Sequence, residues 1–313
     1  SEIDDFVLAD DSKIKWSSRL KECLARGQKA EFSNEKIRRA FYRPFSREFL
    51  FYDDVMTHRP AHWKVIFPVP ESENENRVIC LRTAGNTKPF HCLMTNTISD
   101  LHLTGDSQCF PFYVYNEDGS NRRENISDWA LAQFNAEFRM MNDEHKSNAE
   151  GENSSFRIHH SEITKWDIFY YVYALLHSPA YREKYAANLK RDLPHIPFVD
   201  SVETFWKYVE AGKKLADLHV NYESQPEYPL EMVENPEAKL DWRVEKMKLV
   251  KNPLPASPKN PKSGFLGEGK PGHPPKSDDP QSDLGGAEGG GATLVYNNFL
   301  TLRGIPAEAF EYR

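Results

Sequence analysis

Short apolar runs separated by turn-forming residues occupy the region from Phe49 to Tyr115, and this pattern predicts a β-rich part of the chain. Asn, Gly, Asp and Pro stand between the runs, as they do between the strands of a sheet. The predicted strands are 49–52, 64–67, 77–82, 90–94 and 108–115.

Helix-forming signals lie before and after this region. Thr164 followed three residues later by Asp167 resembles a capping box, in which each side chain bonds the backbone N–H of the other residue. Ser178-Pro179 has the arrangement of a cap followed by a first helical turn, and Asp200 or Ser201 can cap a further helix. The predicted helices are 33–41, 127–141, 164–176, 178–193 and 201–219, and an acidic loop is expected at 143–155.

The stretch from Asn252 to Gly291 is rich in Pro, Gly, Ser and Lys. It contains too little apolar surface to offset the entropy of ordering it, so we expect a flexible loop. The apolar runs 293–296 and 299–302 follow it and predict strands.

These patterns predict an α+β chain, with an N-terminal β-rich region, a helical region and a long flexible loop before a C-terminal β-segment. The chain begins with Ser1 rather than Met and stops soon after a predicted strand, so we expect a piece of a larger protein with truncated C-terminal strands. The predicted parts are a helical or linker segment at 1–32, the β-rich region at 33–160, the helical region at 161–251, the loop at 252–292 and strands at 293–313.

The average charge of the chain conceals a basic segment. The net charge is −7 and the sequence pI is about 5.9, which by themselves disfavour a nucleic-acid partner. Residues 36–64 differ, because seven Lys and Arg residues there outnumber Glu48, Asp53 and Asp54. A basic face on an acidic protein is compatible with DNA, since phosphates respond to the local field. An ordinary solvated surface is the alternative.

Motifs for catalysis and for metal binding are not convincing. Residues 264–270 have the spacing of a phosphate-binding loop, but Pro271 stands where a Ser or Thr must ligate magnesium. None of the Asn-Pro pairs continues into the Pro-aromatic pair of an amino-methyltransferase. The cysteines 23, 80, 92 and 109 have no metal-binding spacing and are expected to be buried free thiols in a reducing cytosol. No apolar run is long enough to span a membrane.

Four blocks of residues together resemble the C-terminal specificity domain of Type ISP restriction–modification enzymes. They cover the chain from about Ser33 to Tyr312 in the expected order, and the third block, within His177–Glu223, is the most specific. The blocks are Phe41–Arg47 with Tyr52-Asp53 and Arg59-Pro60, then Gln108–Tyr115, then Ser178–Arg182 with Pro194–Phe198, Gly212–His219 and Asn221–Glu223, and last Val295–Asn297 with Gly304–Pro306.

The resemblance implies a domain that recognises a short asymmetric DNA sequence. The parent would be one large polypeptide in the bacterial cytoplasm, joining a nuclease, a helicase-like motor and an adenine N6-methyltransferase to this domain. The implied partners are double-stranded DNA and the methyltransferase and helicase regions of the same polypeptide, with no membrane. Catalysis would lie upstream, so this fragment is expected to be non-catalytic and without a cofactor, whereas S-adenosylmethionine, ATP and Mg would serve the parent enzyme. A non-catalytic interaction or scaffolding domain of a phage-defence or DNA-processing protein is the alternative.

Base reading needs hydrogen-bond donors on loops, chiefly Arg or Lys toward guanine and Asn or Gln toward adenine. The loop 82–88 is therefore the leading candidate, whereas most apolar and aromatic residues of 177–223 have the spacing of helix-packing positions. His219, Asn221 and Tyr222 can bond inside the fold as well as to a ligand. The predicted DNA-contacting residues are His58, Arg59, Lys64, Arg82, Thr83, Asn86, Thr87, Lys88, Asn96, Arg122 and Arg123, and an ordinary exposed polar side chain is the alternative for each. No catalytic or metal-ligating residue is predicted.

Overall fold

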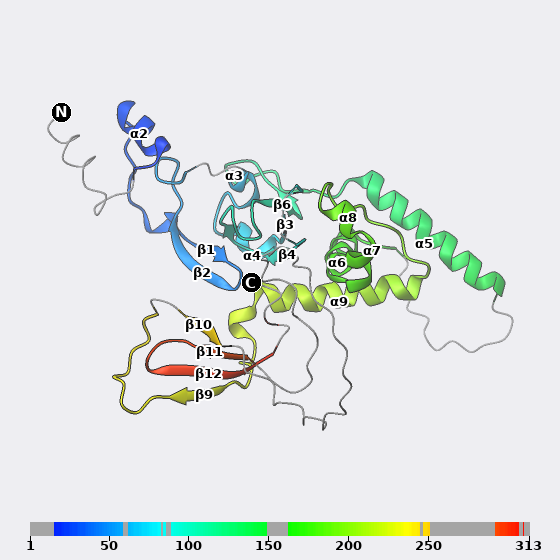
Figure 1. Ribbon diagram of the computed structural model, residues 1–313. Helices are drawn as coiled ribbons and strands as arrows, with labels where there is room; N and C mark the ends of the chain where they lie inside the picture. The colour runs from blue at the N-terminus through cyan, green and yellow to red at the C-terminus, as the bar shows by residue number, and fades with distance from the viewer. Residues whose placement is uncertain are drawn as a thin grey trace, which may run out of the picture. The chain divides into compact units, whose positions relative to one another are not determined.

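The computed structural model (Figure 1) describes residues 16–58, 62–82, 84–85, 89–148, 162–244, 247–250, 292–306 and 309, with only the backbone for 142–148. The chain divides into two units, Ser1–Gln225 and Pro226–Arg313. Both helices and sheets are present, so the predicted α+β class is confirmed. Within the described residues, no helix combines the length and the apolar character that crossing a membrane requires.

A long hairpin begins the first unit after helix α2 (Ser18–Ala25). Its strands β1 (Ile37–Arg43) and β2 (Ser46–Phe51) pair antiparallel, and β1 also pairs in parallel with β5 (Ile98–Ser99). The helix predicted at 33–41 is therefore wrong. Ser33 does act as a cap, with Oγ accepting from the N–H of Glu35, but only the 3₁₀ turn η1 (Asn34–Lys36) follows. Pairing with β2 overrides the local helix signal.

The central sheet has the strand order β4-β3-β6 and lies at the centre of the β-rich region. Its strands are β3 (Val78–Arg82), β4 (Cys92–Thr95) and β6 (Ser107–Pro111), followed by the short ribbon β7 (Tyr113–Val114) and β8 (Arg123–Glu124). All of β4 and all but the last residue of β3 are buried. The strands predicted near 77–82, 90–94 and 108–115 are thus confirmed.

Two short helices connect the hairpin to this sheet, α3 (Trp63–Ile66) and α4 (Ser72–Glu75). The strand predicted at 64–67 is wrong, because the N–H of Ile66 bonds the carbonyl of His62 in a helical turn. A short apolar run does not distinguish a strand from a buried helical turn. Here the rings of Trp63 and Phe67 stack with centroids 5.7 Å apart, and this packing favours the turn.

The helical part of the first unit follows the predicted caps. Thr164 and Asp167 form the capping box of α6 (Lys165–His177), and Ser201 rather than Asp200 caps α9 (Val202–Val220). Ser178 also caps as predicted, but the helix after it, α7 (Pro179–Lys184), ends before Tyr185, and α8 (Ala186–Leu189) is a separate turn. The helices are α5 (Asp128–Asn148), α6 (Lys165–His177), α7 (Pro179–Lys184), α8 (Ala186–Leu189), α9 (Val202–Val220) and the 3₁₀ turn η2 (Tyr222–Ser224), so α5 occupies part of the range expected to be an acidic loop.

Helices α6 and α9 pack closely in the core of the first unit. Gly212 makes the contact possible, because a Cβ at this position would lie 2.0 Å from the carbonyl oxygen of Tyr170. Tyr171, Phe205 and Val209 are buried beside it. This supports the interpretation of the 177–223 stretch as a packing frame.

The second unit is a four-stranded antiparallel sheet with the order β10-β11-β12-β9. Its strands are β9 (Glu231–Glu234), β10 (Lys248–Val250), β11 (Ala292–Val295) and β12 (Leu300–Ile305). The strands predicted at 293–296 and 299–302 are confirmed. The helical assignment of 161–251 is wrong for its last part, where β9 and β10 are strands. The loop predicted at 252–292 lies outside the described residues except for Ala292, which begins β11.

Candidate nucleic-acid interface

Two of the described residues predicted to contact DNA, Arg82 and Asn96, mark two groups at opposite ends of β4. The first group is on the β3–β4 loop, residues 83–91, which leaves the sheet after Arg82. The second group includes Asn96, which follows Thr95 at the other end of β4. β4 has four residues, and a strand rises by about 3.3 Å per residue, so about 10 Å of strand separates the two ends.

Arg82 holds the base of the β3–β4 loop. Its Nε donates to the carbonyl oxygen of Thr104 at 2.5 Å, and Nη1 donates to the carbonyl oxygen of Pro89. Its backbone N–H also bonds the carbonyl of His91 at 3.0 Å. The arginine therefore joins both ends of the loop to the segment before β6, and two of its guanidinium N–H groups are used inside the protein.

The tip of this loop lies next to the end of α8. Gly85 has φ +84°, a conformation that L residues with a side chain rarely adopt, and its N–H donates to the carbonyl of Lys190 at 2.7 Å. Lys190 and Arg191 are both exposed, and within the described part of the chain their side chains form no ion pair. Thr83 and the predicted residues 86–88 of the loop are outside the described residues.

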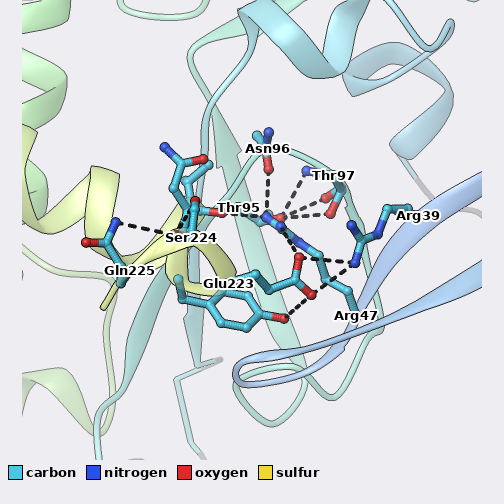
Figure 2. Close-up of polar contacts among 11 residues, drawn as sticks. Arg39, Arg47, Thr95, Asn96, Thr97, Glu223, Ser224 and Gln225 are labelled. Carbon is cyan, nitrogen blue, oxygen red and sulfur yellow. Dashed lines mark hydrogen bonds and ion pairs between the residues drawn. The ribbon is translucent and has the colours of Figure 1, made fainter. Parts of the chain in front are cut away.

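Asn96 takes part in a polar junction around Arg47 (Figure 2). Arg47 donates to Asn96 Oδ1 at 3.2 Å, to the carbonyl of Val220 at 2.6 Å and to Glu223 at 3.3 Å. Its guanidinium also lies over the ring of Tyr222, 5.2 Å from the centroid. The junction thereby fastens the β1–β2 hairpin and the β4–β5 turn to the end of α9.

The basic segment 36–64 is largely neutralised within the fold. Each of its cations among the described residues forms an ion pair with an acid, so their charge is not free to create a strong field toward DNA. The sequence count overstated the free positive charge, because several of the acids come from other parts of the chain. The pairs are Lys36–Asp53 at 2.7 Å, Arg38–Glu73, Arg39–Glu223 at 3.0 Å, Arg43–Asp100 at 2.7 Å, Arg47–Glu223 at 3.3 Å and Lys64–Asp54 at 2.7 Å.

The other predicted residues differ in whether their side chains are already bonded within the protein. Arg122 pairs with Glu75 and lies over the ring of Tyr113, 4.7 Å from the centroid. Arg123 on β8 and His58 are exposed, and in the described residues neither side chain has a hydrogen bond or an ion pair. Arg59 is outside the described residues.

A group of imidazoles, of which His219 is buried and His91 and His177 are half-buried, lies between β4 and the helices. Burial is the main cause that lowers the pKa of His91 and of His177 to about 4, and of His219 to about 3. The ring of His219 bonds the hydroxyl of Tyr173, so this histidine serves the packing of α6 against α9. Cys92, 3.6 Å from the His177 ring, has a pKa raised to about 12 by burial, which makes its thiol unreactive.

The block at the end of α9 also bonds inside the fold. Asn221 Nδ2 donates to Asp217 at 2.7 Å, and the ring of Tyr222 stacks on Phe41 with centroids 5.9 Å apart. The predicted free thiols are confirmed: Cys23, Cys80 and Cys92 are buried, whereas Cys109 is half-buried. In the described ranges, no three His, Cys, Asp or Glu side chains gather as metal ligands do.

Comparison with protein families decides the family of the chain. The model of the Type ISP C-terminal specificity domain matches residues 2–313, which is essentially the whole sequence. The chain belongs to the Type ISP C-terminal specificity domain family. A search of curated proteins gives no significant match.

Solved structures similar to this specificity domain are those of much longer chains. The DrdV–DNA complex has 27% identity over 94% of this chain with a TM-score of 0.62. A nuclease-deletion mutant of the Type ISP restriction–modification enzyme LlaGI, in complex with a DNA substrate mimic, has 30% identity over 95% with a TM-score of 0.59. The ATP-dependent Type ISP enzyme LlaBIII bound to DNA has 27% identity over 96% with a TM-score of 0.61. The specificity domain spans 24%, 21% and 16% of these chains.

Sequence reasoning missed two cations of the specificity domain, Lys190 and Arg191. They belong to a stretch interpreted as helical frame, and about a hundred residues separate them from the β3–β4 loop in the sequence. Only the bond between Gly85 and Lys190 places them beside that loop. No pattern in the sequence indicates this proximity.

Proposed function

We propose that this chain recognises a short asymmetric DNA sequence as the specificity domain of a large restriction–modification polypeptide. It would position an adenine methyltransferase, and through it a motor and a nuclease, on that site. The match of the specificity-domain family over residues 2–313 carries the proposal, and the DNA in each of the three related structures supports it.

Catalysis, in this proposal, belongs to other regions of the polypeptide. The half-buried His91 and His177 and the buried His219 stay neutral near pH 7, because their pKa values are lowered mainly by burial, so they suit a structural role and not proton transfer to a substrate. S-adenosylmethionine, ATP and Mg would act in those other regions.

The β3–β4 loop is the proposed base-reading element. Asn86 and Lys88 supply the donors that read adenine and guanine, and Thr83 and Thr87 add smaller polar contacts. Arg82 is reassigned from base reading to positioning the loop, because its guanidinium bonds Thr104 and Pro89. Lys190 and Arg191 would contact phosphates beside the bases that the loop reads.

Lys64, Arg122 and Arg123, near the Thr95 end of the central sheet, form the rest of the second group and would contact the DNA backbone. β7 continues directly from β6 at the Thr95 end of the sheet, and Arg123 on β8 pairs with Val114 of β7. Arg123 is the strongest phosphate contact of this group, because its charge is free. Lys64 and Arg122 contribute less, since each already neutralises a carboxylate.

Selection from a pool of random duplexes tests the proposed function. The intact polypeptide is incubated with the pool at moderate salt, and the bound duplexes are sequenced over several rounds. Enrichment of one short asymmetric sequence is expected. Binding without enrichment of any sequence, or no salt-dependent binding at all, would instead favour an interaction or scaffolding domain.

A further inference from the structure

A concavity in the second unit contains cations that the proposed recognition surface does not use. Its volume is about 800 Å³, and its walls come from the loop after β9, the start of β10 and the β11–β12 turn. The side chains that matter are Lys239, Arg243, Lys248, Asp241 and Asn297. Among the described residues, its lining belongs wholly to the second unit.

Asn297 fixes the shape of this concavity. Its Nδ2 donates to the carbonyl oxygens of Asp241 at 2.6 Å and Arg243 at 3.1 Å, and its Oδ1 accepts from the N–H groups of Phe299 and Leu300 at 2.8 Å each. The amide therefore joins the 238–243 loop to the β11–β12 turn by hydrogen bonds. Both N–H donors and both acceptor sites of the amide are used, so this wall of the concavity is held in place before a ligand binds.

The charge of the concavity is positive and unpaired. Lys239, Arg243 and Lys248 are exposed, and across the described residues none of their side chains has a carboxylate partner. Asp241 is the acid in the lining, and its Oδ1 accepts from the backbone N–H of Arg243 at 2.9 Å. This arrangement is the opposite of the segment 36–64, where every described cation has an acid partner.

We infer that this concavity binds backbone phosphates of duplex DNA without reading bases. Three unpaired cations around one preorganised hollow are placed to neutralise phosphates and release their counterions, which is the main source of sequence-independent affinity. The Asn297 amide in the wall is fully used and is not available to read a base edge. The inference goes beyond the proposed recognition by the β3–β4 loop and rests on the proposed function for the choice of DNA as the anion.

The test is a charge-neutralising triple variant, Lys239→Gln, Arg243→Gln and Lys248→Gln, in the full polypeptide. Affinity for a duplex of random sequence is measured at a series of KCl concentrations. Because each phosphate contact contributes about 0.9 to the slope of log K against log salt, the slope should fall in magnitude by about 2 to 3 and the affinity should fall at every salt concentration. The ratio of affinities for selected and scrambled duplexes should not change.

A matched triple variant controls for overall charge. Lys21→Gln, Lys207→Gln and Lys214→Gln remove the same charge from α2 and α9, outside the concavity. This control should keep most of the wild-type slope. An equal loss of slope in both triples, or no loss in the first, overturns the inference. A third outcome also overturns the inference: inorganic phosphate raises the melting temperature of the wild type only, while the triple variant keeps the wild-type affinity for the duplex. The concavity would then bind a free anion and not DNA.

A positioning variant separates shape from charge. Asn297→Ala keeps all three cations but releases the 238–243 loop, and it should reduce the salt slope by less than the triple variant does. Failure of this inference and failure of the proposed function give different results. Loss of slope in the triple variant of a polypeptide that selects no sequence would support the concavity and refute sequence recognition.

Discussion

The Nε of Arg82 donates a hydrogen bond to the carbonyl oxygen of Thr104 at 2.5 Å, across the base of the β3–β4 loop. A second bond from the same guanidinium reaches the carbonyl of Pro89, at the far end of that loop. One side chain thus fixes where the loop leaves the central sheet and where it returns. The loop can vary in sequence while its anchor stays in place.

Arg82→Lys should destabilise the protein although it retains the charge. A single ammonium cannot reproduce the two directed bonds of the guanidinium, and hydrogen bonds to charged groups contribute about 1.5–3 kcal/mol each. We expect a lower denaturant midpoint and weaker discrimination between selected and scrambled duplexes. Arg191→Lys, at an exposed position, is the control and should behave as wild type in unfolding. Wild-type stability of Arg82→Lys would refute the anchoring role.

Gly212→Ala should be among the most damaging single-methyl changes. The added Cβ would meet the carbonyl oxygen of Tyr170 at 2.0 Å, so α6 and α9 must move apart. Overpacking of this kind costs about 1–3 kcal/mol or more. Ala211→Gly on the exposed side of α9 is a matched control, and it should cost only the helix propensity of about 1 kcal/mol. Thermal unfolding monitored by circular dichroism measures both, and an unchanged melting temperature for Gly212→Ala contradicts the packing.

The two arginines that bond Glu223 should differ sharply on replacement by alanine. The side chain of Arg47 is 11% exposed and also bonds Asn96 and Val220, whereas that of Arg39 is 51% exposed. Arg47→Ala leaves part-buried acceptors unsatisfied and should cost about 2–4 kcal/mol. Arg39→Ala removes an exposed pair and should cost less than about 1 kcal/mol. Urea unfolding of the two variants gives the comparison, and equal losses would exclude the proposed junction.

Stability should fall as the pH falls below about 6.5. The pKa values of His177 and His219 in the folded protein are lowered to about 4 and about 3, mainly by burial, from the ordinary 6.5. Below about pH 6.5 the unfolded chain binds protons that the folded chain does not, so each histidine removes up to about 1.4 kcal/mol per pH unit down to the folded pKa. Folded-state stability from these groups is therefore fully present only above about pH 6.5.

Urea midpoints measured from about pH 7 down to about pH 4.5 check this dependence. His177→Gln or His219→Asn should flatten the slope, because each removes an imidazole whose pKa is lowered by burial. A wild-type midpoint that stays constant over this range would show that these imidazoles are not held neutral by burial.

Local signals in the sequence predicted the elements that depend on local bonds. The Thr164–Asp167 capping box and the Ser201 cap are satisfied within one helical turn, so neighbouring residues determine them. The errors occur where distant residues decide. Residues 37–41 become a strand because β2 and β5 pair with them, and 64–67 become a helical turn through aromatic packing.

The candidate site was less predictable than the fold, for an electrostatic reason. Counting Lys and Arg along 36–64 gave a basic segment, but Glu73, Asp100 and Glu223 reach it from elsewhere in the chain. Conversely, the free cations Lys190 and Arg191 lie in a stretch whose pattern indicates packing. Free charge depends on which residues meet in the folded chain, and a linear count does not contain that information.

Sequence discrimination by the β3–β4 loop is the central claim, and a double variant tests it most directly. Asn86→Ala with Lys88→Ala is compared with Lys190→Ala plus Arg191→Ala, using a duplex selected by the wild type and a scrambled duplex at the same salt. The loop variant should lower the selected-to-scrambled affinity ratio by about tenfold or more, since one lost base contact is worth about 1–3 kcal/mol. The Lys190–Arg191 variant should weaken both duplexes equally. A loop variant that keeps the wild-type ratio would contradict the account.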